Sequence, residues 1–193
     1  PDRFIPLAEE TGLIKQLGEW VLLETCRQGK EWQQKGLPAI NLAVNISPAQ
    51  FRNSHILESV FNALEQTGYP ASLLELELTE SALMTHENEA VETLNALRKY
   101  GIRLAIDDFG TGYSSLAYLK RFPLDVLKID KSFVEDIPHQ KDDMEIAAAI
   151  VAMAHTLRLK VLAEGVETEE QLAFLKEQGC DCYQGYLVSP PVP

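Results

Sequence analysis

The chain has 193 residues, of which 46% are hydrophobic, and its formal net charge at pH 7 is −12. That length and composition fit one globular domain with a substantial core, and the negative charge disfavours binding to long nucleic acid or to an anionic membrane surface. No apolar run approaches the roughly eighteen residues of a membrane span, and the N-terminus has no signal-peptide pattern, so we expect a cytoplasmic location and no membrane contact.

Helical patterns alternate with short apolar strands along the chain, which is typical of parallel β-α units. Gly36 and Pro38 mark the end of one helix, Ser47 caps the next at Pro48, and Thr168 with Gln171 forms a capping box. The predicted helices are residues 4–10, 14–35, 87–100, 114–121 and 168–178, one that starts at Pro48 and ends before Gly68, and a long one that includes Ile146 and Leu157. The six predicted strands are residues 40–46, 73–79, 102–107, 125–130, 159–163 and 180–186.

Alternate residues within the strands are apolar, and these are expected to face the helices. The intervening residues are polar. They include Asn41, Glu75, Arg103 and Lys160, and also the last polar residue of each strand. In a doubly wound sheet both faces should be apolar, so a polar second face favours the lumen of a barrel. An antiparallel sheet with one wet face is the alternative, which the intervening helices disfavour. We predict the α/β class and a (β/α)8 TIM-type barrel.

The last polar residues of the strands meet at the carboxyl ends, where β/α barrels place their active sites. They are Asn45, Glu77, Asp107, Lys128, Glu164 and Gln184. The adjacent carboxylates of Asp107 and Asp108 repel each other unless a cation lies between them, and these oxygen ligands suit Mg²⁺ or Mn²⁺. Two such ions can activate a water and hold a phosphoryl centre, with Lys128 adding positive charge.

Two structural interpretations stay open at this point. The stretch from Asp107 to Leu116 is rich in turn residues and could be a solvated turn. The polar lumen could instead hold mutually satisfied ion pairs, and we expect such a pair, Glu75 with Arg103, in its deeper layer. The histidines at 55, 86, 139 and 155 lack ligand spacing, and Cys26, Cys180 and Cys182 are expected to be reduced core thiols.

Six ordered motifs resemble those of the EAL domain, a family of bacterial phosphodiesterases that linearise the second messenger cyclic di-GMP. They are Val-Asn-Ile-Ser at Asn45, Glu-Leu-Thr-Glu from Glu77 to Glu80, Asp-Asp-Phe-Gly-Thr-Gly from Asp107, Lys-Ile-Asp from Lys128, Ala-Glu-Gly-Val-Glu at Glu164 and Gln-Gly-Tyr from Gln184. The resemblance covers residues 1–193 and implies hydrolysis of cyclic di-GMP to linear pGpG with two Mg²⁺ or Mn²⁺ ions.

The resemblance also implies roles for individual residues. Asn45, Glu77, Asp107 and Asp108 would be metal ligands, and Gln184 and Asp130 would contact the substrate. Lys128 and Glu164 would be catalytic, with Glu164 acting as base or metal ligand. Glu80 would brace the loop that holds Phe109, Gly110, Thr111 and Gly112, which in the family links the metal site to the interface of a homodimer. Members of the family are often fused to sensor or diguanylate cyclase-like domains.

One departure from the family pattern affects the expected activity. The family is named after a Glu-Ala-Leu motif, whose Glu is a metal ligand in the family. This motif does not occur in the present sequence. With six predicted strands instead of eight, we expect the domain to be incomplete at its N-terminus, without its first two strands, and the chain alone to be inactive. A catalytically silent cyclic di-GMP receptor and a purely structural interaction module are the rival functions.

Overall fold

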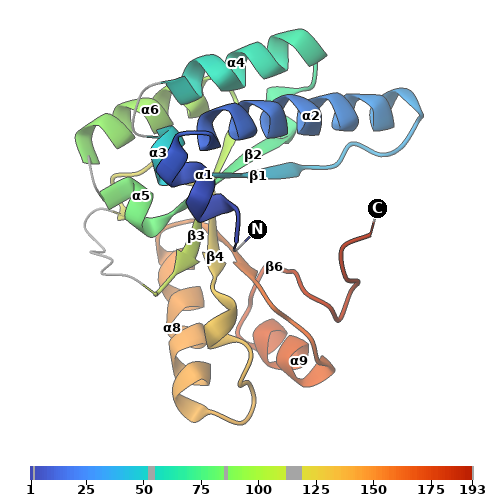
Figure 1. The fold of residues 1–193 in the computed structure, drawn as a ribbon. Helices are drawn as coiled ribbons and strands as arrows, with labels where there is room; N and C mark the ends of the chain where they lie inside the picture. The colour runs from blue at the N-terminus through green and yellow to red at the C-terminus, as the bar shows by residue number, and fades with distance from the viewer. Residues whose placement is uncertain (2, 52–54, 85–86, 112–118, 193) are drawn as a thin grey trace. The chain divides into compact units, whose positions relative to one another are not determined.

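The structure, a computed structural model, describes residues 1, 3–51, 55–84, 87–111 and 119–192 (Figure 1). These residues form two compact units. The first comprises Pro1–Leu104 and Arg121–Pro123, and the second comprises Ala105–Lys120 and Leu124–Pro193. Each unit is described here by itself.

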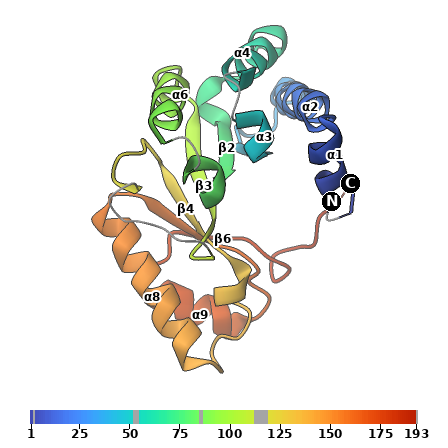
Figure 2. The ribbon, with the colours of Figure 1, turned by 60° about the vertical axis from the view of Figure 1, so that its left-hand side comes forward.

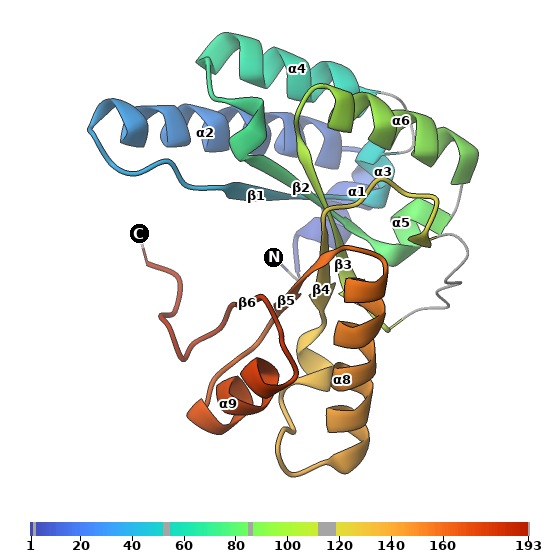
Figure 3. The ribbon, with the colours of Figure 1, turned by 180° about the vertical axis from the view of Figure 1, so that it is seen from behind.

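The first unit contains two parallel strands and most of the helices. Its elements are α1 (Ile5–Thr11), α2 (Ile14–Gln34), β1 (Leu42–Ile46), α3 (Pro48–Phe51), α4 (His55–Thr67), the 3-10 turn η1 (Ala71–Leu73), β2 (Leu74–Thr79), α5 (Glu80–Met84) and α6 (Glu87–Lys99). β1 and β2 pair in parallel, from Leu42 opposite Leu74 to Ile46 opposite Leu78. α2 and α4 lie side by side over these strands (Figure 3).

The second unit continues the parallel pattern. Its elements are β3 (Arg103–Phe109), which begins in the first unit, β4 (Val126–Ile129), the 3-10 turn η2 (Lys131–Phe133), α8 (Lys141–Thr156), β5 (Lys160–Ala163), α9 (Glu169–Glu177) and β6 (Cys182–Tyr183). β3 pairs with β4, β4 with β5, and β5 with β6, all in parallel. α8 packs against β4 and β5 (Figure 2).

The predicted helix signals and strand faces are confirmed where the structure describes them. The Thr168 side chain accepts from the Gln171 amide, and the Gln171 side chain accepts from the Thr168 amide, which completes the capping box of α9. In β1, Val44 and Ile46 are buried whereas Asn45 is exposed, as the alternation predicts. The apolar residues Leu74 and Leu76 of β2 are fully buried in the first unit, and Ile106, Leu127 and Ile129 of β3 and β4 are fully buried in the second.

Two predicted elements differ from the structure, and a third lies mostly outside the described residues. The single helix expected from Pro48 is two helices, α3 and α4. The predicted strand 180–186 is ordered as a strand only at Cys182–Tyr183, because the chain beyond it bonds to the residues that follow β5 instead of continuing a regular ladder. Most of the helix predicted at 114–121 lies outside the described residues. Among the described residues, no helix combines the length and the apolar character needed to cross a membrane.

Candidate active site

Asp107 and Asp108 lie near the end of strand β3, between Ile106 and Phe109, where the register with β4 shifts. Asp107 is buried, and its Oδ1 accepts a hydrogen bond of 3.0 Å from the Asp108 amide. Asp108 has φ 54 and Gly110 has φ 100, both in the left-handed region. Thr111 Oγ1 donates to the Asp108 carbonyl at 2.8 Å. The end of β3 therefore departs from regular strand conformation at Asp108.

Lys128, on β4, is the centre of the site. Its side chain is 3% exposed, and its Nζ lies 3.0 Å from Asp107 Oδ1 and 2.7 Å from Glu164 Oε1. Glu164 directly follows β5, so three neighbouring parallel strands bring these side chains together at their carboxyl ends. The convergence of Asp107, Lys128 and Glu164 that strand order predicts is therefore present in the second unit.

The carboxylates around Lys128 have the spacing of a metal site. Oxygen atoms of Asp107, Asp108 and Glu164 all lie within 4.8 Å of one another. Burial, followed by the charges of Asp107 and Asp130, raises the pKa of Asp108, and the positive charge of Lys128 only partly opposes this. An added divalent cation would relieve the repulsion, and an all-oxygen donor set suits Mg²⁺ or Mn²⁺. The residues present thus fit a metal ion, and a simple solvated turn does not explain a buried Asp107.

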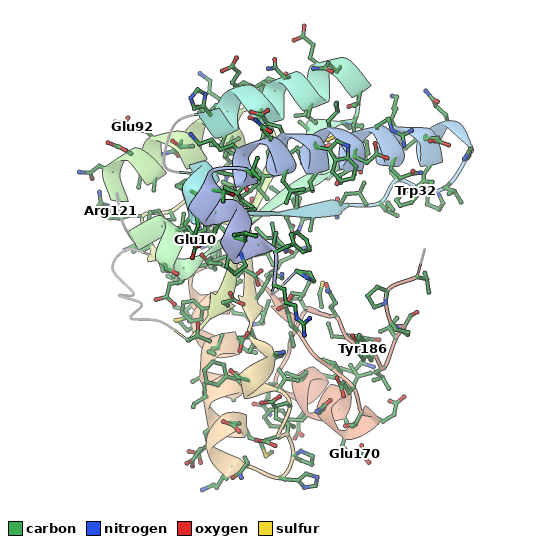
Figure 4. All side chains as sticks on the ribbon, in the orientation of Figure 1. Glu10, Trp32, Glu92, Arg121, Glu170 and Tyr186 are labelled. Carbon is green, nitrogen blue, oxygen red and sulfur yellow. The ribbon has the colours of Figure 1, made fainter. Side chains whose placement is uncertain are left out.

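Asp130 and Gln184, the predicted substrate contacts, have different surroundings. Asp130 Oδ1 accepts from the Ser132 amide at 3.0 Å, so this oxygen caps the turn η2. The Gln184 amide donates to the Ala163 carbonyl at 2.8 Å, and its side chain is exposed. Tyr186 follows on the same segment and is 65% exposed (Figure 4). Both predicted contact residues lie in the second unit, and their role toward a substrate stays a prediction.

The remaining predicted ligands lie in the first unit. Asn45 of β1 and Glu77 of β2 are register partners, so strand pairing brings them side by side. Asn45 is exposed, whereas Glu77 is 7% exposed. The expected ion pair of the deeper layer is also present, because Arg103 Nε lies 3.2 Å from Glu75 Oε2.

Glu80 opens the short helix α5 directly after β2 and is 4% exposed. Within the described residues its Oε2 has no hydrogen-bond partner, which is unusual for a buried carboxylate oxygen. Phe109 is buried and Gly110 and Thr111 are exposed, while Gly112 lies outside the described residues. The bracing of this loop by Glu80 stays a prediction.

The sequence did not reveal the pairing of His155 with Asp181. His155 Nε2 lies 2.9 Å from Asp181 Oδ2, which also accepts from the Val161 amide at 2.8 Å. Burial alone would raise the pKa of Asp181, but the hydrogen bonds from His155 and Val161 outweigh it and hold that pKa below its ordinary value. This pair ties the end of α8 to β5.

The cysteines are free, as predicted, but they do not all lie in the core. Burial raises the pKa of the Cys26 thiol to about 11, and it raises that of Cys180 to about 11 as well. Cys182 is exposed. The expectation of three core thiols is therefore wrong for the exposed Cys182, and Cys180 is only partly buried.

Comparison with curated proteins gives relatives that include cyclic di-GMP phosphodiesterases. A model of the EAL domain matches residues 1–191. The cyclic di-GMP phosphodiesterase NbdA of Pseudomonas aeruginosa is 53% identical over 193 residues, which are all of this chain and 25% of NbdA. The cyclic di-GMP phosphodiesterase PdeR of Escherichia coli is 41% identical over all of this chain and 29% of PdeR. The chain thus spans only about a quarter of the length of these relatives.

Solved structures show the same likeness. The MucR phosphodiesterase in complex with c-di-GMP superposes with a TM-score of 0.96 at 49% identity, over 100% of this chain and 78% of that one. The EAL domain of Mycobacterium smegmatis DcpA gives a TM-score of 0.86 at 40% identity, over 91% of this chain and 79% of that one. The predicted α/β fold of TIM-barrel type is confirmed, and the chain belongs to the EAL domain family.

Proposed function

We propose that this domain hydrolyses cyclic di-GMP to linear pGpG with the help of two divalent ions, Mg²⁺ or Mn²⁺. The observation that carries the proposal is the group of three carboxylates, with oxygens within 4.8 Å of one another, around a buried lysine at the strand ends. The relatives named as cyclic di-GMP phosphodiesterases, and the c-di-GMP complex of MucR, support the choice of substrate.

The chain offers ligands that suit these ions. Asp107, Asp108 and Glu164 would hold metal through carboxylate oxygens, and Asn45 and Glu77 would supply further oxygen ligands. When bound, the ions would polarise the phosphoryl oxygens and make a water molecule more acidic. Family membership supports metal dependence, and the oxygen-only donor set supports Mg²⁺ or Mn²⁺ over softer metals.

Lys128 and Glu164 would act directly in the reaction, through proton transfer and through stabilisation of charge. Glu164, whose Oε1 lies 2.7 Å from the lysine ammonium, would act either as a metal ligand or as the base that accepts a proton from an attacking water. The Lys128 ammonium is held by two carboxylates and almost fully buried, so its charge acts in a region of low dielectric. It would stabilise negative charge that grows on the phosphoryl oxygens in the transition state.

We also propose that this domain is fused to other domains in a larger protein. The relatives include the bifunctional diguanylate cyclase/cyclic di-GMP phosphodiesterase MucR and the oxygen sensor protein DosP, of which this chain spans 28% and 24%. These names support fusion to sensor or cyclase-like domains in the full protein. Homodimerisation through the loop after β3, and a cytoplasmic location, stay predictions.

The test uses the full protein that carries this domain. It is incubated with cyclic di-GMP and Mg²⁺ or Mn²⁺, product is separated by chromatography, and a parallel sample contains excess chelator. We expect pGpG to form with metal and not with chelator. Binding of the dinucleotide without product would replace the proposal by the receptor function, and neither binding nor product would favour an interaction module.

A further inference from the structure

We infer that Gly165 is a positioning residue for Glu164, and that it acts through close contact with Lys131. Gly165 lies between Glu164 and Val166 in the segment after β5, and Lys131 begins the turn η2 after β4. The inference rests on the proposed function, because it concerns how the site carboxylate of Glu164 is held beside Lys128.

The space at Gly165 excludes a side chain. A Cβ built on Gly165 would lie 2.7 Å from Lys131 Cβ and 3.4 Å from Lys131 Cα. Both atoms belong to the fixed base of the lysine, so they cannot move away as the end of a flexible side chain could. Gly165 also has φ +68, a left-handed conformation in which an L side chain costs about 1–2 kcal/mol.

The backbone on both sides of Gly165 is fixed by hydrogen bonds. The Glu164 amide donates to the Ile129 carbonyl at 3.1 Å, and the Val166 amide donates to the Gln184 carbonyl at 3.1 Å. Gly185 packs directly against Val166, where an added Cβ would overlap the carbonyl oxygen. Glu164 is thus held between the end of β4 and the segment after β6, and a displacement at residue 165 would be transmitted to it.

The carboxylate of Glu164 has little tolerance for such a displacement. It lies 2.7 Å from Lys128 Nζ and shares the 4.8 Å cluster with Asp107 and Asp108. A shift of about 1 Å in a catalytic group can reduce the rate by roughly 10²-fold. Residues that orient metal ligands typically change metal affinity or activity by about 10–100-fold when replaced. Gly165 should belong to this class although it has no side chain with which to bind a metal.

The test compares Gly165→Ala with the matched control Gly179→Ala in the full protein. Gly179 has φ +84, and its nearest atom, His155 Cε1, would lie 3.9 Å from a new Cβ, so this variant carries the left-handed cost without the contact. Both variants should lose unfolding free energy through the left-handed conformation, and Gly165→Ala should lose more because it also carries the contact with Lys131. Only Gly165→Ala should lower kcat and the Mn²⁺ affinity measured by calorimetry, each by about 10–100-fold.

A rescue variant identifies the contact as the cause. Lys131→Gly removes the Cβ that a side chain at 165 would meet, so the double variant Lys131→Gly/Gly165→Ala should recover at least about tenfold of the lost Mn²⁺ affinity and kcat. If Gly165→Ala fails to fold, Gly165→Asn replaces it, because asparagine tolerates the left-handed region while keeping a Cβ.

Equal Mn²⁺ affinity and kcat in Gly165→Ala and Gly179→Ala, or a double variant without recovery, would overturn the inference. Its failure is distinguishable from failure of the proposed function. If the unmodified protein produces no pGpG but Gly165→Ala still weakens Mn²⁺ binding and the double variant restores it, the positioning role stands and the phosphodiesterase proposal falls.

Discussion

Arg103 and Lys128 are both cationic side chains on strands, and both pair with carboxylates, yet their surroundings differ. Arg103 is 30% exposed and lies 3.2 Å from Glu75. Lys128 is 3% exposed, contacts Asp107 and Glu164, and faces a cluster in which Asp108 and Asp130 add further negative charge. The first arrangement neutralises one charge with another. The second leaves an excess of negative charge on one buried and three partly buried carboxylates, which favours binding of an additional cation.

The difference shows how a structural ion pair and a candidate metal site can be separated within one fold. Both groups lie on strands with alternating polar and apolar residues, so polarity alone does not distinguish them. The balance of charge does, and so does position, since Lys128 lies at the carboxyl ends of parallel strands where barrel enzymes carry out chemistry. Substitutions that alter either the Glu75–Arg103 pair or the cluster around Lys128, but not both, test this interpretation.

The largest expected effect comes from Asp107→Asn. The change removes a negative charge with almost no change in volume, so the fold should remain intact while metal binding is lost. Because a bound metal contributes several kcal/mol to catalysis, we expect kcat to fall by about 10³-fold or more. Product chromatography and circular dichroism measure the two effects. Near-normal hydrolysis by this variant would reject Asp107 as a metal ligand.

Lys128→Ala should have the next largest effect. Loss of a charge that stabilises the transition state typically lowers kcat by about 10²–10³-fold, and KM for cyclic di-GMP should change far less. Mn²⁺ affinity should not weaken, because the carboxylates keep their charge and lose a competing cation. Steady-state kinetics and calorimetry give these values. A rise in KM with kcat unchanged would assign Lys128 to substrate binding only.

Glu80→Ala extends the comparison to a carboxylate outside both groups. Its Oε2 lacks a hydrogen-bond partner within the described residues, and we predict that it accepts hydrogen bonds from the loop after β3. Loss of such a buried charged bond typically costs about 2–5 kcal/mol, so homodimerisation should weaken by at least tenfold. Analytical ultracentrifugation measures this, with Glu80→Gln as the control of similar shape.

Two results bear on that prediction separately. A weakened dimer with unchanged Mn²⁺ affinity would support a role in coupling the loop to the interface. Unchanged dimerisation together with unchanged kinetics would remove the idea.

The smallest expected effect is that of Glu75→Gln. The partner of this carboxylate, Arg103, is partly exposed, so solvent screening limits the loss of unfolding free energy to about 1 kcal/mol. Urea unfolding measures it, and Arg103→Met provides the reciprocal change. Mn²⁺ affinity should stay at the unmodified value in both variants. A large loss of metal affinity would show that the two groups are not independent.

Much of this arrangement was predictable from residue order. Alternation within the strands identified Glu75 as a partner of Arg103 and placed Asp107, Lys128 and Glu164 at strand ends. Neighbouring parallel strands then had to bring the last three together, because their carboxyl ends lie at one edge. The chemistry followed from the residue types, since adjacent carboxylates need a cation.

Other features depended on contacts between distant residues. α5 begins at Glu80 immediately after β2, with no glycine or proline between them to mark the change. The strand at Cys182 stops early because Gly185 allows the chain to bond to the segment after β5, which local sequence does not show. His155 and Asp181 are far apart in the chain, and only the packing of α8 onto β5 brings them together.

The left-handed backbone of Asp108 has an evolutionary consequence. With φ 54 this residue occupies a conformation that glycine adopts without steric cost, and its carboxyl is partly buried among other acids. Both features oppose stability, which fits the metal-binding role proposed for this aspartate. In a lineage released from selection for hydrolysis, drift should replace Asp108 by glycine or asparagine early. Such a replacement in a relative would then mark a domain that has lost its chemistry while keeping its fold.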